Sequence, residues 1–108
     1  MQLLVDKDWG SSSLWVPSNA GWASCDHHSF NLPNYLQERC DYLSDWYESY
    51  WPGTDQPEPD WESYSAYKLA LAIDIKRHYG EAAQIFVWQG DSLVEISGKF
   101  SQMTRSES

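Results

Sequence analysis

Short apolar runs near both ends of the chain predict β-strands. Runs of four to eight residues that are rich in β-branched and aromatic side chains and bounded by turn residues are typical of strands. Four segments fit this description: 2–6, 12–16, 84–88 and 93–97. The sequence Gln-Gly-Asp-Ser between the last two indicates a hairpin turn. Residues 18–30 show no clear period and are predicted to form a loop, because Pro17 ends the second run.

A first helix is predicted after this loop. Asn31 is suited to cap it, and Pro33 is tolerated in a first helical turn. Pro52-Gly53 should end it. The apolar residues recur at spacings of three and four and form one face of the helix: Leu32, Leu36, Cys40, Leu43, Tyr47 and Tyr50.

A second helix is predicted over Trp61–Tyr79, with Asp60 as its N-cap and Gly80 at its C-terminal end. Its apolar residues lie on two nearly opposite sides, which is typical of a helix buried on both sides. The helix could lie between the sheet and the first helix, or one side could meet a partner, for example in a dimer.

These elements predict an α+β fold in the order ββααββ. About four short strands should form a small antiparallel or mixed sheet that packs against a two-helix hairpin. We expect one globular domain at residues 1–98, followed by a polar C-terminal tail at 99–108.

Charged residues are distributed unevenly along the chain. The formal net charge is −9, from sixteen acidic residues against seven Lys and Arg. Residues 26–62 hold nine of the acids and a single base, Arg39. Such segregation indicates one acidic face, which would repel nucleic acid and anionic membranes and attract a basic surface.

The first helix carries much of this charge. Its acids fall at spacings of i, i+3, i+7 and i+10, and so form one stripe opposite the apolar face: Glu38, Asp41, Asp45 and Glu48. Like charges at this spacing destabilise an isolated helix, and the stripe contains no lysine. Tyr35, Tyr42 and Trp46 flank it. Because Tyr and Trp are favoured interface residues, Tyr42 and Trp46 are candidate contacts beside the acids.

The stripe therefore suggests a binding protein that neutralises a basic partner. Carboxylates repeated along a helix could imitate a line of phosphates and occupy a basic nucleic-acid-binding cleft. A toxin nuclease or another nucleic-acid-processing protein would fit, and steering by charge would make the association fast and salt-sensitive. The other interpretation is that the stripe is simply the solvated face of an amphipathic helix.

Several short motifs resemble those of small acidic bacterial proteins, some of which are toxin-immunity proteins. They are Ser-Leu-Trp at 13–15, Leu-Pro-Asn-Tyr-Leu-Gln-Glu-Arg at 32–39, Trp46, and Asp-Trp at 60–61 before an Ala/Leu-rich helix. The resemblance runs from Ser13 to Gly80. It implies an inhibitor of one cognate toxin and implies no catalytic residue.

The candidate metal ligands are adjacent in the predicted loop: Cys25, Asp26, His27 and His28. All four are transition-metal ligand types, but no second ligand pair completes a familiar spacing. A small metal protein or an enzyme with Cys25 as nucleophile therefore stays an alternative, as does a self-associating module. We expect no enzyme activity, because a domain of this size has no second layer to form a cleft. We expect no cofactor, because no phosphate-binding glycine motif is present.

The remaining expectations concern the compartment. The sequence has no apolar run long enough to cross a membrane and no signal-peptide pattern, so we expect a cytoplasmic protein. In a reducing compartment Cys25 and Cys40 should be free thiols.

Overall fold

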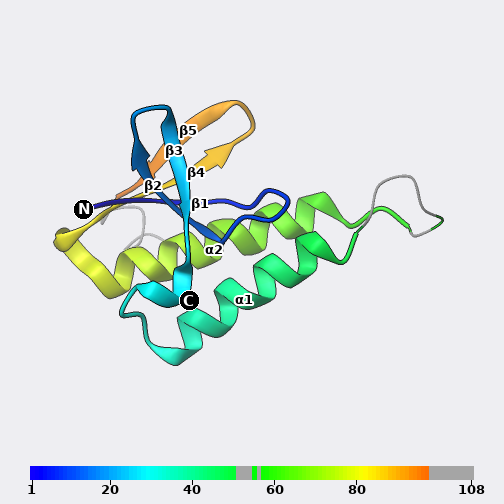
Figure 1. Cartoon of the computed structure of the whole chain (residues 1–108), viewed down its shortest axis with the longest axis horizontal. Coiled ribbons are helices and arrows are strands. Elements are labelled where there is room, and N and C mark those ends of the chain that lie inside the picture. Colours follow the sequence, from blue (N-terminus) through cyan, green and yellow to red (C-terminus); the bar gives the residue numbers. More distant parts are fainter. Residues whose placement is uncertain (51–54, 56, 98–108) are drawn as a thin grey trace.

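The computed structural model describes residues 1–50, 55 and 57–97. It contains a five-stranded sheet and two helices packed on one side of it (Figure 1). The strands are β1 (Gln2–Val5), β2 (Leu14–Ser18), β3 (Gly21–Cys25), β4 (Gln84–Gln89) and β5 (Ser92–Ile96). The helices are α1 (Asn34–Glu48) and α2 (Trp61–Tyr79), with single 3₁₀ turns η1 (His27–Ser29) and η2 (Gly80–Ala82).

The sheet is mixed, with strand order β3-β2-β1-β4-β5. Antiparallel pairs join β1 to β2, β2 to β3, and β4 to β5, whereas β1 and β4 are parallel. Parallel neighbours need a crossover connection, which here includes both helices. The α+β class and the mixed sheet with two helices are thus confirmed, but the element order is βββααββ rather than ββααββ.

The core lies between the sheet and the helices. One face of the sheet contributes fully buried side chains from β1, β2, β4 and β5, including Leu3, Leu14, Ile85 and Ile96. Helix α2 covers this face, and α1 packs against α2 (Figure 1). The predicted inward residues of the first helix are buried at Leu32, Leu36, Cys40 and Leu43.

The opposite sheet face is aromatic. The strand register places Trp15 beside Leu4 and Leu4 beside Phe86, so these residues share one face. Trp22 of β3 contacts the ring of Phe86 at a centroid distance of 5.7 Å. Neither helix covers this face, on which the buried Leu4 lies between Trp15 and Phe86.

The prediction of a loop at residues 18–30 is wrong in part. Strand β3 forms inside that segment and pairs with β2 across a tight turn at Asn19-Ala20. Strand β2 also continues through Pro17 to Ser18. Pro17 lies beyond the residues of β2 that pair with β1, so its missing N–H removes no bond to that neighbour.

The predicted start of the first helix is also wrong. Helix α1 begins at Asn34, and Pro33 occupies the cap position without a side-chain hydrogen bond. The Pro33 carbonyl accepts the backbone N–H groups of Leu36 and Gln37 instead. Asn31 lies two residues before this cap, because Leu32 precedes Pro33 and is therefore restricted to extended backbone. The expected stop at Pro52-Gly53 and the tail at 99–108 lie outside the described residues.

Helix α2 has the predicted bounds and caps. The Asp60 carboxylate accepts the backbone N–H of Ser63 at 3.2 Å, and Gly80 has φ of +58°. The helix lies between the sheet and α1, which accounts for its two apolar sides within one chain. A dimer through this helix stays a prediction.

Candidate functional site

The acids of α1 fall into two groups, and Glu48 belongs to the group that has partners. The Lys7 ammonium donates to the Glu48 carboxylate at 2.7 Å, and the Gly10 N–H donates to the same oxygen at 3.0 Å. These bonds lower the pKa of Glu48. The expectation that the stripe has no basic partner is therefore wrong for Glu48, because Lys7 reaches it from 41 residues away in sequence.

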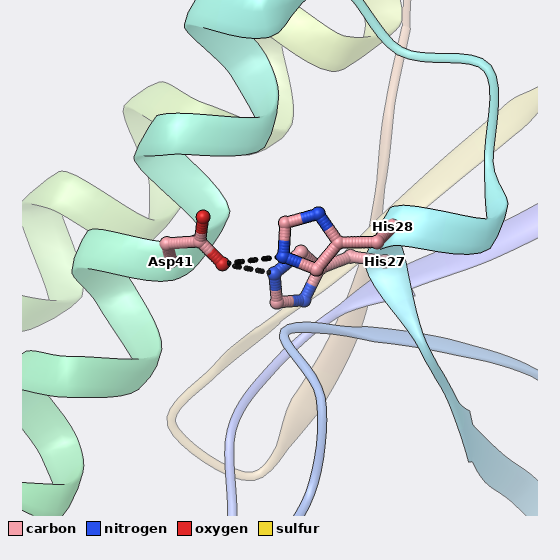
Figure 2. A group of neighbouring side chains, drawn as sticks. All are labelled: His27, His28 and Asp41. Atoms are coloured by element: carbon pink, nitrogen blue, oxygen red, sulfur yellow. Dashed lines mark hydrogen bonds and ion pairs between the residues drawn. The ribbon is translucent and has the colours of Figure 1, made fainter.

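Asp41 is the second partnered acid. Its Oδ1 atom accepts from Nε2 of His27 at 2.7 Å and from Nε2 of His28 at 2.8 Å (Figure 2). Burial opposes the charge of Asp41, but the two histidine hydrogen bonds outweigh it and lower its pKa. The stripe and the histidine-containing segment, which the sequence presented as separate candidates, thus meet at one carboxylate.

The other two acids remain exposed. The carboxylates of Glu38 and Asp45 have no hydrogen bond or ion pair to any described residue. Two tyrosines share their side of α1, Tyr35 and Tyr42, and each is 56% exposed. These four residues are spaced i, i+3, i+7 and i+10, so Tyr and acid alternate along one line of the helix, which we call the α1 ridge: Tyr35, Glu38, Tyr42 and Asp45.

The single base of the acidic segment does not neutralise this ridge. Arg39 forms an ion pair with Asp74 of α2. Its guanidinium also lies over the ring of Tyr67, 5.2 Å from the centroid. Arg39 therefore joins the two helices and leaves the ridge acidic.

Trp46 lies mainly inside the helix hairpin. Its ring contacts those of Tyr42, Tyr64 and Tyr67 at centroid distances of 5.6–6.0 Å. It is half-buried, so only part of it is available as the partner contact that the sequence suggested. Much of the aromatic density in α1 is explained in this way, because edge-to-face rings hold α1 against α2.

The turn η1 presents the two histidines. The Asp26 carboxylate accepts the backbone N–H of His28 at 3.0 Å and so fixes the turn. His27 is buried, and its Nδ1 lies 2.8 Å from the hydroxyl of Ser12. His28 is more exposed, and its Nδ1 lies 3.2 Å from Oε1 of Gln37. Hydrogen bonds to Gln37 and Asp41 raise the pKa of His28.

Ser12, His27 and Asp41 have the hydroxyl–imidazole–carboxylate order of a hydrolase triad. However, the Ser12 oxygen already accepts the backbone N–H groups of His27 and Leu14, at 2.9 and 3.3 Å. A hydroxyl has two acceptor lone pairs, so neither is left for nucleophilic attack. We therefore assign Ser12 to holding the His27 ring.

The cysteines lie apart from this cluster. Cys40 is fully buried in α1, and burial raises the pKa of its thiol to about 12, which fits the expected inert core cysteine. Cys25 at the end of β3 is half-buried, with its sulfur 3.7 Å from the Ser29 hydroxyl. Both are free thiols. Among the described residues, the ligand atoms that converge belong to His27, His28 and Asp41, not to Cys25 or Asp26.

An open, polar pocket of about 410 Å³ surrounds the histidines. Serine side chains from the β1–β2 connection, β3 and α1 line it together with His27, His28 and Asp41. No local sequence signal predicts this site, because Asp41 is separated from the histidines by 14 and 13 residues.

Comparison with protein families, curated proteins and solved structures finds no match to this chain. The resemblance to immunity proteins therefore stays an expectation. Within the part of the chain that the structure describes, neither helix is long and apolar enough to cross a membrane.

Proposed function

We propose that this protein binds and neutralises a basic protein partner through the α1 ridge. The observation that carries the proposal is the alternation of two exposed tyrosines with two carboxylates along about 15 Å of helix, neither carboxylate having a partner among the described residues. Tyrosine rings bury a large area with few rotors, and their faces attract cations. Carboxylates beside them would pair with lysine and arginine of the partner.

The chemistry of the ridge favours a protein partner over a nucleic acid. The net charge of −9 repels phosphate, and the ridge itself carries no base. A basic toxin or another nucleic-acid-processing protein is the proposed class of partner, since its cleft is built to receive regularly spaced negative charge. The proposed compartment is the cytoplasm.

Site-specific photo-crosslinking in the native host tests this proposal. In one variant a photoreactive phenylalanine analogue replaces Tyr42. In the control it replaces Glu81, an exposed residue of η2 directly after α2. The Tyr42 variant should give one major cross-linked product with a basic protein, and the Glu81 variant should not. The same product from both positions, or an acidic product from Tyr42, would contradict the proposal.

A further inference from the structure

The two histidine side chains of η1 converge on a single atom. Both Nε2 atoms lie within 2.8 Å of Asp41 Oδ1. The three potential ligand atoms lie within 4.8 Å of one another, and the side chains point inward from η1 and α1 (Figure 2). Two imidazole nitrogens and one carboxylate oxygen form a ligand set that zinc and related divalent ions use in proteins.

The surroundings of His28 favour a cation at this point. The Gln37 amide donates from Nε2 to the Leu32 carbonyl at 2.9 Å, which leaves Oε1 as the acceptor that faces His28 Nδ1. The hydrogen on Nδ1 is used there, so a neutral His28 would direct its Nε2 lone pair at an oxygen of Asp41. Either a proton or a metal ion between the two removes that repulsion. A hydrogen bond from Nδ1 to an oxygen is also the usual outer contact of a metal-binding histidine.

His27 needs a change of tautomer for the same arrangement. In the structure its Nδ1 accepts the Ser13 backbone N–H at 3.4 Å and faces the Ser12 hydroxyl at 2.8 Å, so its hydrogen is on Nε2. Metal binding at Nε2 moves that hydrogen to Nδ1, where the Ser12 hydroxyl can accept it in place of the long bond from the Leu14 N–H at 3.3 Å. Burial and the contact with Ser12 hold this ring in place, whereas the more exposed His28 and Asp41 can adjust.

We propose that His27, His28 and Asp41 bind one divalent transition-metal ion, with Zn²⁺ as the best match. Ligand atoms around a tetrahedral ion with bonds of about 2.0–2.1 Å are separated by about 3.3 Å, so each Nε2–Oδ1 distance, 2.7 and 2.8 Å here, needs to lengthen by about half an ångström. Three protein ligands leave a fourth position open toward the serine-lined pocket, where water can complete the coordination. The site shares no residue with the α1 ridge, so the two proposals stand or fall separately.

Calorimetric titration of the full chain, without a histidine tag, tests the site. Zn²⁺ should bind with one-to-one stoichiometry, and Mg²⁺, which prefers oxygen ligands, should not bind. His28→Gln and Asp41→Asn should each weaken Zn²⁺ binding at least tenfold. Because both side chains are partly exposed, the variants should stay folded, which circular dichroism verifies.

Two control variants exclude other zinc ligands. Cys25→Ser removes the nearby thiol, and His78→Gln removes the histidine on α2; neither should alter the affinity. Co²⁺ should give the visible absorption of a tetrahedral site in the wild type and lose it in His28→Gln. Absence of one-to-one Zn²⁺ binding, or binding that His28→Gln and Asp41→Asn leave unchanged while Cys25→Ser abolishes it, would overturn the proposal.

Discussion

Lys7 shows how one residue can alter the interpretation of a whole surface. Its side chain is buried, and its ammonium donates to the carbonyls of Asp8 and Ser11 at 2.8 and 2.6 Å. The third bond, to Glu48, ties the end of α1 to the loop after β1. Glu48, which helical spacing alone placed among the exposed acids, therefore helps to hold α1 against the rest of the fold.

Glu48→Gln should lower the free energy of unfolding at pH 7 by less than about 1 kcal/mol, because the pair is partly exposed to solvent. The pKa of Glu48 is lowered in the folded state, so its stabilising effect is present above the unfolded pKa of about 4.3. The effect is lost as pH falls through the folded pKa. Urea unfolding of both proteins at pH 7 and pH 3 should show a smaller difference at pH 3 than at pH 7, and an equal difference at both would be contrary to this account.

The hydroxyl of Tyr64 is a second side-chain group with a predictable effect on stability. Its hydroxyl is buried and has no hydrogen-bond partner among the described residues. Since an unsatisfied buried polar group is destabilising by about 1–3 kcal/mol, Tyr64→Phe should leave the free energy of unfolding unchanged or raise it. A loss of more than about 1 kcal/mol in urea denaturation would show that the hydroxyl has a partner.

At the scale of elements, a buried serine joins α1 to the sheet. The Ser13 hydroxyl, just before β2, donates to the Cys40 carbonyl at 2.6 Å and lies 2.7 Å from the Ser44 hydroxyl. Ser13→Ala should therefore destabilise the protein by about 1–2 kcal/mol, because the Cys40 carbonyl loses a donor and the Ser44 hydroxyl loses its acceptor. Ser65→Ala, on an exposed position of α2, is the matched control and should have little effect. Equal unfolding midpoints for Ser13→Ala and wild type would argue against this anchor.

Local signals predicted the helices better than the strands. Asp60, Gly80 and the apolar spacing define α2 completely, because caps and periodicity act within a few residues. Strand β3 has no such signal: Gly21–Cys25 is held as a strand by pairing with β2. The β-propensity of such a segment is weak, so pairing with a neighbouring strand decides whether it becomes a strand.

In the candidate sites, the sequence predicted which side chains are exposed but not which distant side chains meet. The exposed Tyr and acid positions of the α1 ridge follow from helical spacing alone. The pairing of Asp41 with two histidines, and of Glu48 with Lys7, depends on contacts between distant segments. Single-sequence periodicity carries no information about such contacts, so it predicted four equivalent acids where the structure has two pairs of different kinds.

At the scale of the whole molecule, the fold separates two surfaces of different chemistry. One side of α1 faces the histidine-containing turn η1 and the serine-lined pocket, and the α1 ridge faces outward. Aromatic contacts with α2, which packs on the sheet, hold α1 in place. A rigid helix surface of this kind limits the conformational entropy lost when a partner binds.

Measuring the affinity of the cross-linked partner at low and high salt tests whether the α1 ridge binds a basic protein. Two variants change the net charge equally: Glu38→Lys with Asp45→Lys on the α1 ridge, and Glu81→Lys with Asp91→Lys at exposed positions elsewhere. The ridge variant should bind more than tenfold more weakly than the wild type at low salt, and the other variant should have a much smaller effect. Raising the salt concentration should weaken binding of the wild type. Equal affinities for wild type and the ridge variant, unaffected by salt, would contradict the proposal.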